Sequence, residues 1–161
     1  MLNIINFTLN GENVEVAIDE KETLLDVLRN KCNMTSVKKG CEVGECGACT
    51  VLINGRAVDT CLYLAMWAKD KSILTVEGLM NKKTGELSKI QQAFITETAV
   101  QCGFCIPGII MTAVEVLEYG RPFTRDELRK LISGHLCRCT GYENILNAIE
   151  KVMIEKYGLK K

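Results

Sequence analysis

The sequence predicts an α+β protein in which a small β-rich domain is followed by a bundle of about four helices. Three observations lead to this prediction. Apolar and polar residues alternate between positions 5 and 18, as they do in a half-buried pair of strands. Beyond position 87 the apolar residues recur at helical spacing. Of the nine cysteines, eight fall into two tight groups that are separated along the chain.

The first half is expected to form two hairpins, one helix and a closing strand. Asn10-Gly11 and Asn54-Gly55 are strong hairpin signals, and each lies between apolar stretches. Thr23 has the position of a helix N-cap ahead of four apolar residues. The other expected elements are strands at 50–53, 57–58 and 72–76 and a short helix after residue 61.

The second half is expected to be helical. Ser88 and Thr124 each begin a capping-box pattern, and Pro107 suits the first turn of a helix that ends at Gly120. A last apolar stripe lies in 145–153. A polar, turn-like stretch separates the halves, so we expect one domain at 1–78, a linker at 79–86 and a second domain at 87–161.

Composition excludes several classes of function. Lys and Arg number 20 and Asp and Glu number 20, so the chain lacks the excess positive charge of a nucleic-acid-binding protein. No apolar run approaches the ~18 residues of a membrane span, and the first residues do not resemble a signal peptide. We therefore expect a cytoplasmic protein. Neither a nucleophile–base set nor a nucleotide-binding motif is present, so no catalytic residues are expected on this chain.

The first cysteine group has the spacing C-x4-C-x2-C-x11-C, which matches the plant-type [2Fe–2S] pattern. Three thiolates on one loop can surround one side of a small cluster, and a fourth from a separate segment completes the site. Interleaved glycines allow backbone N–H groups to approach the cluster's sulfides. Structural zinc sites more often use two C-x2–4-C knuckles. The ligands expected here are Cys41, Cys46, Cys49 and Cys61.

The second cysteine group is less specific on spacing alone. Its members are Cys102, Cys105, Cys137 and Cys139, and each pair lies at a junction between expected helices. A helix N-terminus after Cys105 and another after Cys139 would place partial positive charge beside an anionic cluster. A second [2Fe–2S] cluster, a zinc site and a redox dithiol all remain open at this point. The ninth cysteine, Cys32, fits neither spacing and is expected to be a small buried apolar residue.

Three stretches resemble the small iron–sulfur subunit of the molybdenum hydroxylases, the xanthine dehydrogenase family. They are Gly40-Cys-Glu-Val-Gly-Glu-Cys-Gly-Ala-Cys-Thr-Val51, Gln101-Cys-Gly-Phe-Cys-Ile-Pro-Gly108 and Ser133-Gly-His-Leu-Cys-Arg-Cys-Thr-Gly-Tyr142. The resemblance covers nearly the whole chain. It implies a plant-ferredoxin-like β-grasp domain with one [2Fe–2S] cluster and a C-terminal four-helix bundle with a second.

The resemblance also implies two partner chains, a large molybdopterin-binding subunit and a medium FAD-binding subunit, in a heterotrimer. Electrons would leave the molybdenum centre, pass through the bundle cluster and the ferredoxin-like cluster, and reach FAD. In this family Gln101 and Cys139 would lie against the pterin. Family members act on purines, nicotinate, aromatic acyl-CoA, aldehydes or carbon monoxide, and residues 61–67 and 99–105 are most similar to those of xanthine dehydrogenases.

Two positions depart from the family's usual pattern: Ile106 stands where Thr is common, and His135 stands where Asn is common. Neither is an expected cluster ligand. The principal rival function is a free-standing ferredoxin, which would need little beyond residues 1–78 and would leave the helical half without a role. A zinc module would be colourless, whereas an iron–sulfur protein is brown.

Overall fold

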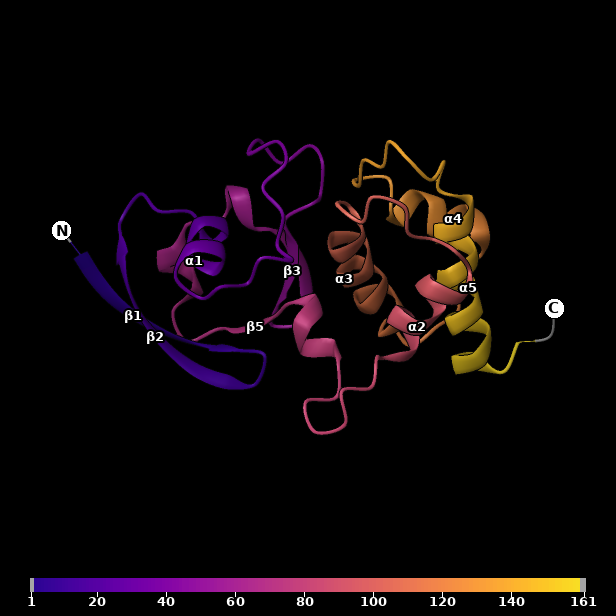
Figure 1. The fold of residues 1–161 in the computed structure, drawn as a ribbon, viewed down its shortest axis with the longest axis horizontal. Coiled ribbons are helices and arrows are strands. Elements are labelled where there is room, and N and C mark those ends of the chain that lie inside the picture. Colours follow the sequence, from indigo (N-terminus) through magenta and orange to yellow (C-terminus); the bar gives the residue numbers. More distant parts are fainter. Residues whose placement is uncertain (1, 160–161) are drawn as a thin grey trace.

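The computed structural model describes residues 2–159 and confirms a mixed α+β fold. Figure 1 shows the strands gathered in one half of the molecule and most of the helical residues in the other. The N-terminal strand lies at one extreme of the long axis, and the last helix lies toward the opposite extreme. Within the described residues, no helix has the length and apolar character needed to span a membrane.

A five-stranded sheet forms the first half. Its order is β2-β1-β5-β3-β4, in which β1 and β5 are parallel and the other neighbouring strands are antiparallel. Both Asn-Gly hairpins are confirmed, and positive φ angles at Gly11 (83°) and Gly55 (81°) fit the type of turn that this dipeptide favours. The strands are β1 (Leu2–Leu9), β2 (Glu12–Asp19), β3 (Thr50–Ile53), β4 (Arg56–Asp59) and β5 (Ser72–Leu74).

Strand β5 is shorter than the predicted strand at 72–76. The backbone N–H of Thr75 donates to the side-chain oxygen of Asn10 at 2.9 Å instead of continuing the sheet. The chain then turns into a short 3-10 helix, η3 (Val76–Leu79). The expected short helix after Cys61 is likewise two 3-10 turns, η1 (Thr60–Leu62) and η2 (Ala65–Ala68).

Helix α1 (Leu24–Asn30) begins as predicted, with the Thr23 hydroxyl accepting from the backbone N–H of Asp26. Its apolar side chains join the inward-facing residues of the sheet in the first core. The largest buried members of that core include Ile5, Ile18, Leu24, Leu25, Leu28 and Ile73.

Four helices form most of the second half: α2 (Lys89–Thr96), α3 (Ile106–Leu117), α4 (Arg125–Leu131) and α5 (Glu143–Tyr157). The capping boxes at Ser88 and Thr124 are confirmed. Helix α5 packs against α2 and α4, and α2 also contacts α3. Phe94, Ile109, Leu128, Ile145 and Leu146 are among the buried residues of this second core.

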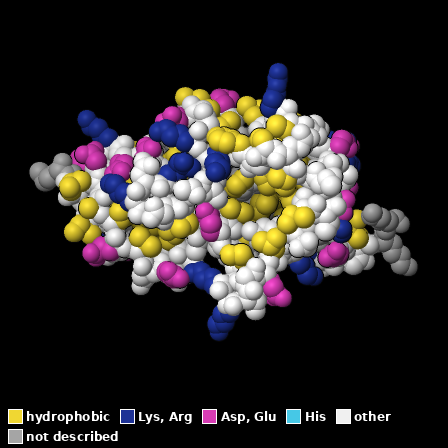
Figure 2. Space-filling view, in the orientation of Figure 1, with side chains coloured by type: hydrophobic (Ala, Val, Ile, Leu, Met, Phe, Trp, Pro, Cys, Tyr) yellow, Lys and Arg dark blue, Asp and Glu magenta, His cyan; other side chains and the backbone are white. Residues whose placement is uncertain are grey.

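Helix α3 joins the two halves, because it packs against β3 and β4 of the sheet. At the closest approach, a Cβ atom on Gly108 would lie 2.2 Å from the carbonyl oxygen of Gly47, so no larger residue fits without movement. At the edge of this contact, Glu115 accepts from Arg56 at 3.3 Å and from the backbone of Ala57 at 3.1 Å. On the face shown in Figure 2, apolar side chains gather over α2 and α3 beside this junction.

Candidate iron–sulfur sites

The first thiol group comprises Cys41, Cys46, Cys49 and Cys61, and the structure brings these residues together as two pairs. Cys41 and Cys46 contact each other on the loop before β3. Cys49, at the end of that loop, contacts Cys61 in η1. Three of the four thiols lie on this loop. The backbone N–H groups of Val43 and Glu45 donate to the sulfur of Cys41 at 3.4 and 3.3 Å.

Two glycines give this loop its shape. A Cβ on Gly40 would lie 2.8 Å from the sulfur of Cys46, so the glycine leaves space for the thiol. Gly47 has a φ of +67°, and a Cβ there would meet His135 from the second half. Glycine is thus needed at both positions for steric reasons, while approach of backbone N–H groups to a cluster's sulfides stays a prediction.

The environments of the four thiols differ. Backbone N–H groups of Val43 and Glu45 lower the pKa of Cys41 to about 6, because they stabilise the thiolate. Burial raises the pKa of Cys49 to about 11. Burial also raises the pKa of Cys46. Because metal ligation requires thiolates, cluster insertion at this group must release protons, above all from Cys49.

The second thiol group comprises Cys102, Cys105, Cys137 and Cys139, again as two pairs. The sulfurs of Cys102 and Cys139 lie 3.6 Å apart and are exposed, whereas Cys105 is buried and contacts Cys137. Two sulfurs bound to one tetrahedral metal ion at about 2.3 Å each would lie about 3.8 Å apart. The Cys102–Cys139 separation therefore already suits two ligands of a single iron.

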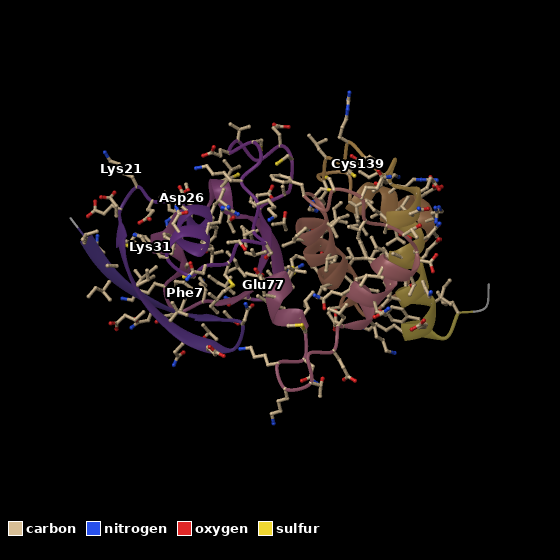
Figure 3. The ribbon with its side chains drawn as sticks, in the orientation of Figure 1. Phe7, Lys21, Asp26, Lys31, Glu77 and Cys139 are labelled. Carbon is tan, nitrogen blue, oxygen red and sulfur yellow. The ribbon has the colours of Figure 1, made fainter. Side chains whose placement is uncertain are left out.

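Helix ends and local hydrogen bonds shape the second group. Helix α3 starts immediately after Cys105, as predicted, but α5 begins only at Glu143, so Cys139 is not adjacent to a helix N-terminus. Burial raises the pKa of Cys105 to about 12. Burial also opposes ionisation of Cys137, but its hydrogen bonds, chiefly with Thr140, outweigh this effect and lower its pKa. In Figure 3, Cys139 lies at the edge of the helical half.

The donor sets fit [2Fe–2S] clusters. Such a cluster binds two thiolates at each of its two irons, and each group supplies two pairs of contacting thiols. Among residues 2–159, no three or more His, Cys, Asp or Glu side chains are arranged around a single metal position. The first group comes from one loop and the turn that follows β4, whereas the second joins two segments more than 30 residues apart, so only the fold brings its two pairs together.

The other residues singled out in the sequence lie near these groups. Gln101 is exposed in the loop between α2 and α3, next to Cys102. Ile106 is buried in the second core at the start of α3. His135 is also buried, at 5 % exposure, and this burial lowers the pKa of its ring and favours the neutral form. Cys32 packs against the first core but is only half-buried, less than the expected burial.

Comparison with known proteins identifies the family to which the chain belongs. Residues 7–74 match the family described as "2Fe-2S iron-sulfur cluster binding domain", and residues 75–150 match "[2Fe-2S] binding domain". The xanthine dehydrogenase iron-sulfur-binding subunit of Escherichia coli O157:H7 is 48% identical over 147 residues, which cover 90% of this chain and 91% of that one. The chain belongs to the small iron–sulfur subunits of the molybdenum hydroxylases.

Further relatives agree with this membership. The nicotine 6-hydroxylase small subunit of Paenarthrobacter nicotinovorans is 48% identical over 145 residues, covering 90% of this chain and 86% of that one. The crystal structure of quinoline 2-oxidoreductase from Pseudomonas putida 86 matches with a TM-score of 0.88 and 43% identity, covering 92% of this chain and 90% of that chain. The chain is thus an electron-transfer subunit of an enzyme of this family, with two [2Fe–2S]-binding domains.

Sequence reasoning missed the residues that link the two thiol groups. The backbone N–H of Leu136 donates to the carbonyl oxygen of Cys46 at 3.0 Å. The Tyr142 hydroxyl accepts from the backbone N–H of Cys137 at 2.8 Å and donates to the carbonyl of His135 at 3.0 Å. No periodic pattern in the sequence indicates these contacts. The only hint is the Gly141-Tyr142 pair after the last cysteine, which is typical of a turn.

Proposed function

We propose that Cys41, Cys46, Cys49 and Cys61 hold one [2Fe–2S] cluster and that Cys102, Cys105, Cys137 and Cys139 hold the other. The paired contacts within each group support this assignment. When bound, the clusters supply one-electron carriers, and the chain's own contribution is to hold them at fixed positions. The chain is then a relay between two redox centres that lie on other subunits.

The main observation that supports electron relay between the two sites is the hydrogen bond between Leu136 and Cys46. Leu136 directly precedes Cys137, a ligand of the second cluster, and Cys46 is a ligand of the first. The two sites are therefore joined by a short run of covalent bonds and a single 3.0 Å hydrogen bond. Such a contact keeps the two sites close together, and a short distance favours electron transfer.

In this proposal, electrons from the molybdenum centre enter the chain at the second cluster. Cys102 and Cys139 are exposed, and Gln101 beside them is exposed as well. A Gln side chain offers two donors and an acceptor, which suits the edge of a pterin. Contact of Gln101 and Cys139 with the pterin would deliver electrons to the second cluster, then to the first, and then to FAD on another chain.

The assembly that follows from this route has three chains: this one, a large molybdopterin-binding subunit and a medium FAD-binding subunit. Within this chain we propose a β-grasp domain at 1–78, a linker at 79–86 and a four-helix bundle at 87–161. The parallel β1–β5 pair and the shared core of α2–α5 support these layouts. A cytoplasmic site is supported by the reduced cysteines that cluster assembly requires.

The names of several relatives support one substrate class. Three specify xanthine, nicotine and quinoline, which are nitrogen heterocycles, whereas the subunit PaoA of Escherichia coli (strain K12) is named for an aldehyde oxidoreductase. We propose that the complex oxidises a nitrogen heterocycle, with a purine such as xanthine as the first compound to test. The substrate itself binds on the molybdenum subunit, so no residue of this chain selects it.

Purification of the complex tests the proposal. Tagged chain should recover two larger polypeptides, and the complex should contain molybdopterin, FAD and both iron–sulfur signals. Gln101→Ala should leave both clusters in place but slow their reduction by substrate or weaken retention of the molybdenum cofactor. Recovery of the chain alone, with full electron-carrier activity toward unrelated enzymes, would instead support a free-standing ferredoxin.

A further inference from the structure

His135 is a buried polar side chain that the cluster chemistry does not use. Its ring is enclosed where the two halves of the molecule meet, and its Nε2 atom shares a 2.7 Å hydrogen bond with the Thr112 hydroxyl. Thr112 is 9 % exposed and lies on α3, the helix that starts at the second thiol group and packs against β3.

The opposite side of the ring rests on the loop of the first thiol group. A Cβ on Gly47 would lie 2.4 Å from Nδ1 of His135 and 2.8 Å from the carbonyl of Gly134. Gly47 lies between two expected ligands, Cys46 and Cys49. The imidazole therefore occupies the space that the missing side chain leaves beside the first cluster.

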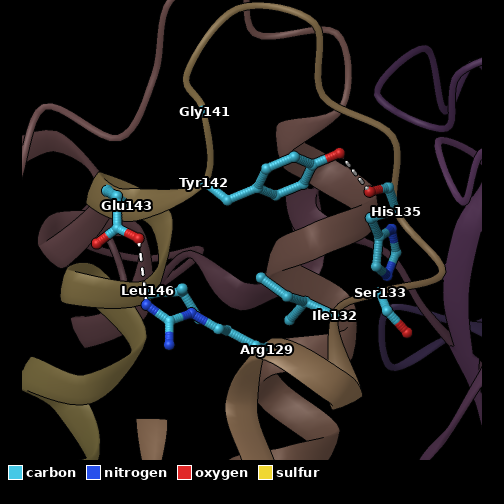
Figure 4. Close-up of a pocket in the computed structure, with 8 residues that line it drawn as sticks. All are labelled: Arg129, Ile132, Ser133, His135, Gly141, Tyr142, Glu143 and Leu146. Carbon is cyan, nitrogen blue, oxygen red and sulfur yellow. Dashed lines mark hydrogen bonds and ion pairs between the residues drawn. The ribbon is translucent and has the colours of Figure 1, made fainter. Parts of the chain in front are cut away.

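The backbone of His135 is fixed to the loop of the second thiol group. Its carbonyl accepts from the Tyr142 hydroxyl, which also accepts from the N–H of Cys137. Figure 4 shows this bond at the wall of a pocket of about 310 Å³, with the imidazole turned away from the tyrosine. One residue thus contacts α3, the first cluster's loop and the second cluster's loop.

Space filling alone does not account for an imidazole here. Nδ1 of His135 is buried against the Gly47 backbone and makes no hydrogen bond of good geometry among the described residues. Burial of an unpaired polar atom is unfavourable, and an apolar side chain of similar size would avoid it. The specific contribution of the ring is its bond to Thr112, which ties α3 to the segment that directly precedes Cys137.

We propose that His135 is a positioning residue that fixes the separation and orientation of the two clusters, and thereby the rate of electron transfer between them. The inference rests on the proposed function, because it requires a cluster at each thiol group. Electron transfer slows steeply with distance, so a small displacement of one loop relative to the other changes the relay without removing either cluster.

Thr112→Val in the iron-loaded chain is the first test, because Val keeps the shape of Thr and removes the hydroxyl. The matched control is Thr75→Val, which removes a buried hydroxyl that bonds Asn10 and Glu77, away from both thiol groups. Two measurements report on position: the spin–spin splitting between the two reduced clusters, and the hydrogen-exchange rate of the Leu136 amide that bridges the halves.

We expect Thr112→Val to keep four iron per chain, to broaden and reduce the splitting, and to speed Leu136 exchange about tenfold, the effect of losing one buried hydrogen bond. Thr75→Val should change neither measurement. Should Thr112→Val fail to fold, His135→Gln and His135→Ala provide the comparison. The Gln amide can reach Thr112 and should retain the splitting, whereas Ala should lose it.

A loss of thermal stability with unchanged splitting and unchanged Leu136 exchange would overturn the proposal and leave His135 as a packing residue. The same holds if His135→Gln and His135→Ala show equal splitting. Absence of two cluster signals in the unsubstituted, iron-loaded chain would overturn the proposed function as well, so the two failures are distinguishable.

Discussion

Substitution of Gly108 by Ala tests how tightly the two halves are held. The added Cβ would lie 2.2 Å from the carbonyl oxygen of Gly47, and both partners are backbone. A close carbon–oxygen contact is about 3.3 Å, so α3 and the first cluster's loop must separate by about 1 Å. Overpacking of this kind typically costs ~1–3 kcal/mol. Ala gains up to ~1 kcal/mol over Gly within a helix.

Because both partners are backbone and cannot simply turn aside, the upper half of this range, about 2–3 kcal/mol, applies, and the net expectation is a loss of about 1–2 kcal/mol in the free energy of unfolding. For a chain of this length each kcal/mol lowers the melting temperature by about 2–4 °C, so Gly108→Ala should melt about 2–8 °C lower. Thermal unfolding of the iron-loaded chain, followed by circular dichroism, measures this. Gly134→Ala is the matched control, because a Cβ there meets no atom within 4 Å. Equal melting temperatures for the two variants would refute a rigid contact between Gly108 and Gly47.

Three further predictions concern the thiols and one carboxylate. Cys32→Ser should leave four iron and four sulfide per chain. An analysis that finds about two of each would contradict the presence of two clusters. Cys49→Ser should abolish only the first cluster's paramagnetic signal and Cys105→Ser only the second's; loss of both from either folded variant would contradict the ligand sets. Burial raises the pKa of Glu77, but hydrogen bonds from Ser36 and Thr75 outweigh burial and hold this pKa below the ordinary value of a Glu carboxyl. The lowered pKa stabilises the fold at pH values above the ordinary carboxyl pKa, and this contribution is lost as the pH falls through the folded-state pKa. Glu77→Gln should therefore cost about 1 kcal/mol near pH 7 in urea unfolding and less near pH 3; a pH-independent difference would contradict this reasoning.

Local chemistry explains why much of the fold could be predicted. The turns at Asn10-Gly11 and Asn54-Gly55 need only their own residues to adopt positive φ angles. The Thr23 cap and the boxes at Ser88 and Thr124 satisfy backbone groups within one helical turn. Each of these signals is complete within four or five residues, and each is confirmed.

Features that depend on distant partners could not be predicted. Strand β5 ends at Leu74 because Thr75 bonds to Asn10, 65 residues earlier. His135 departs from the family's usual residue, but its bond to Thr112 forms between segments 23 residues apart, and its contact with Gly47 arises only when the two halves dock. The cysteine spacings indicated both sites, yet the division into contacting pairs required the fold.

The exposure of Cys102 and Cys139 has a consequence for how the enzyme is built. These two thiols are the accessible members of a group whose third, Cys105, is buried, so iron and sulfide must arrive from their side. The same edge is the surface that a molybdenum subunit would cover in the proposed complex. In the proposed complex, iron and sulfide would therefore have to reach the second thiol group before the catalytic chain covers it.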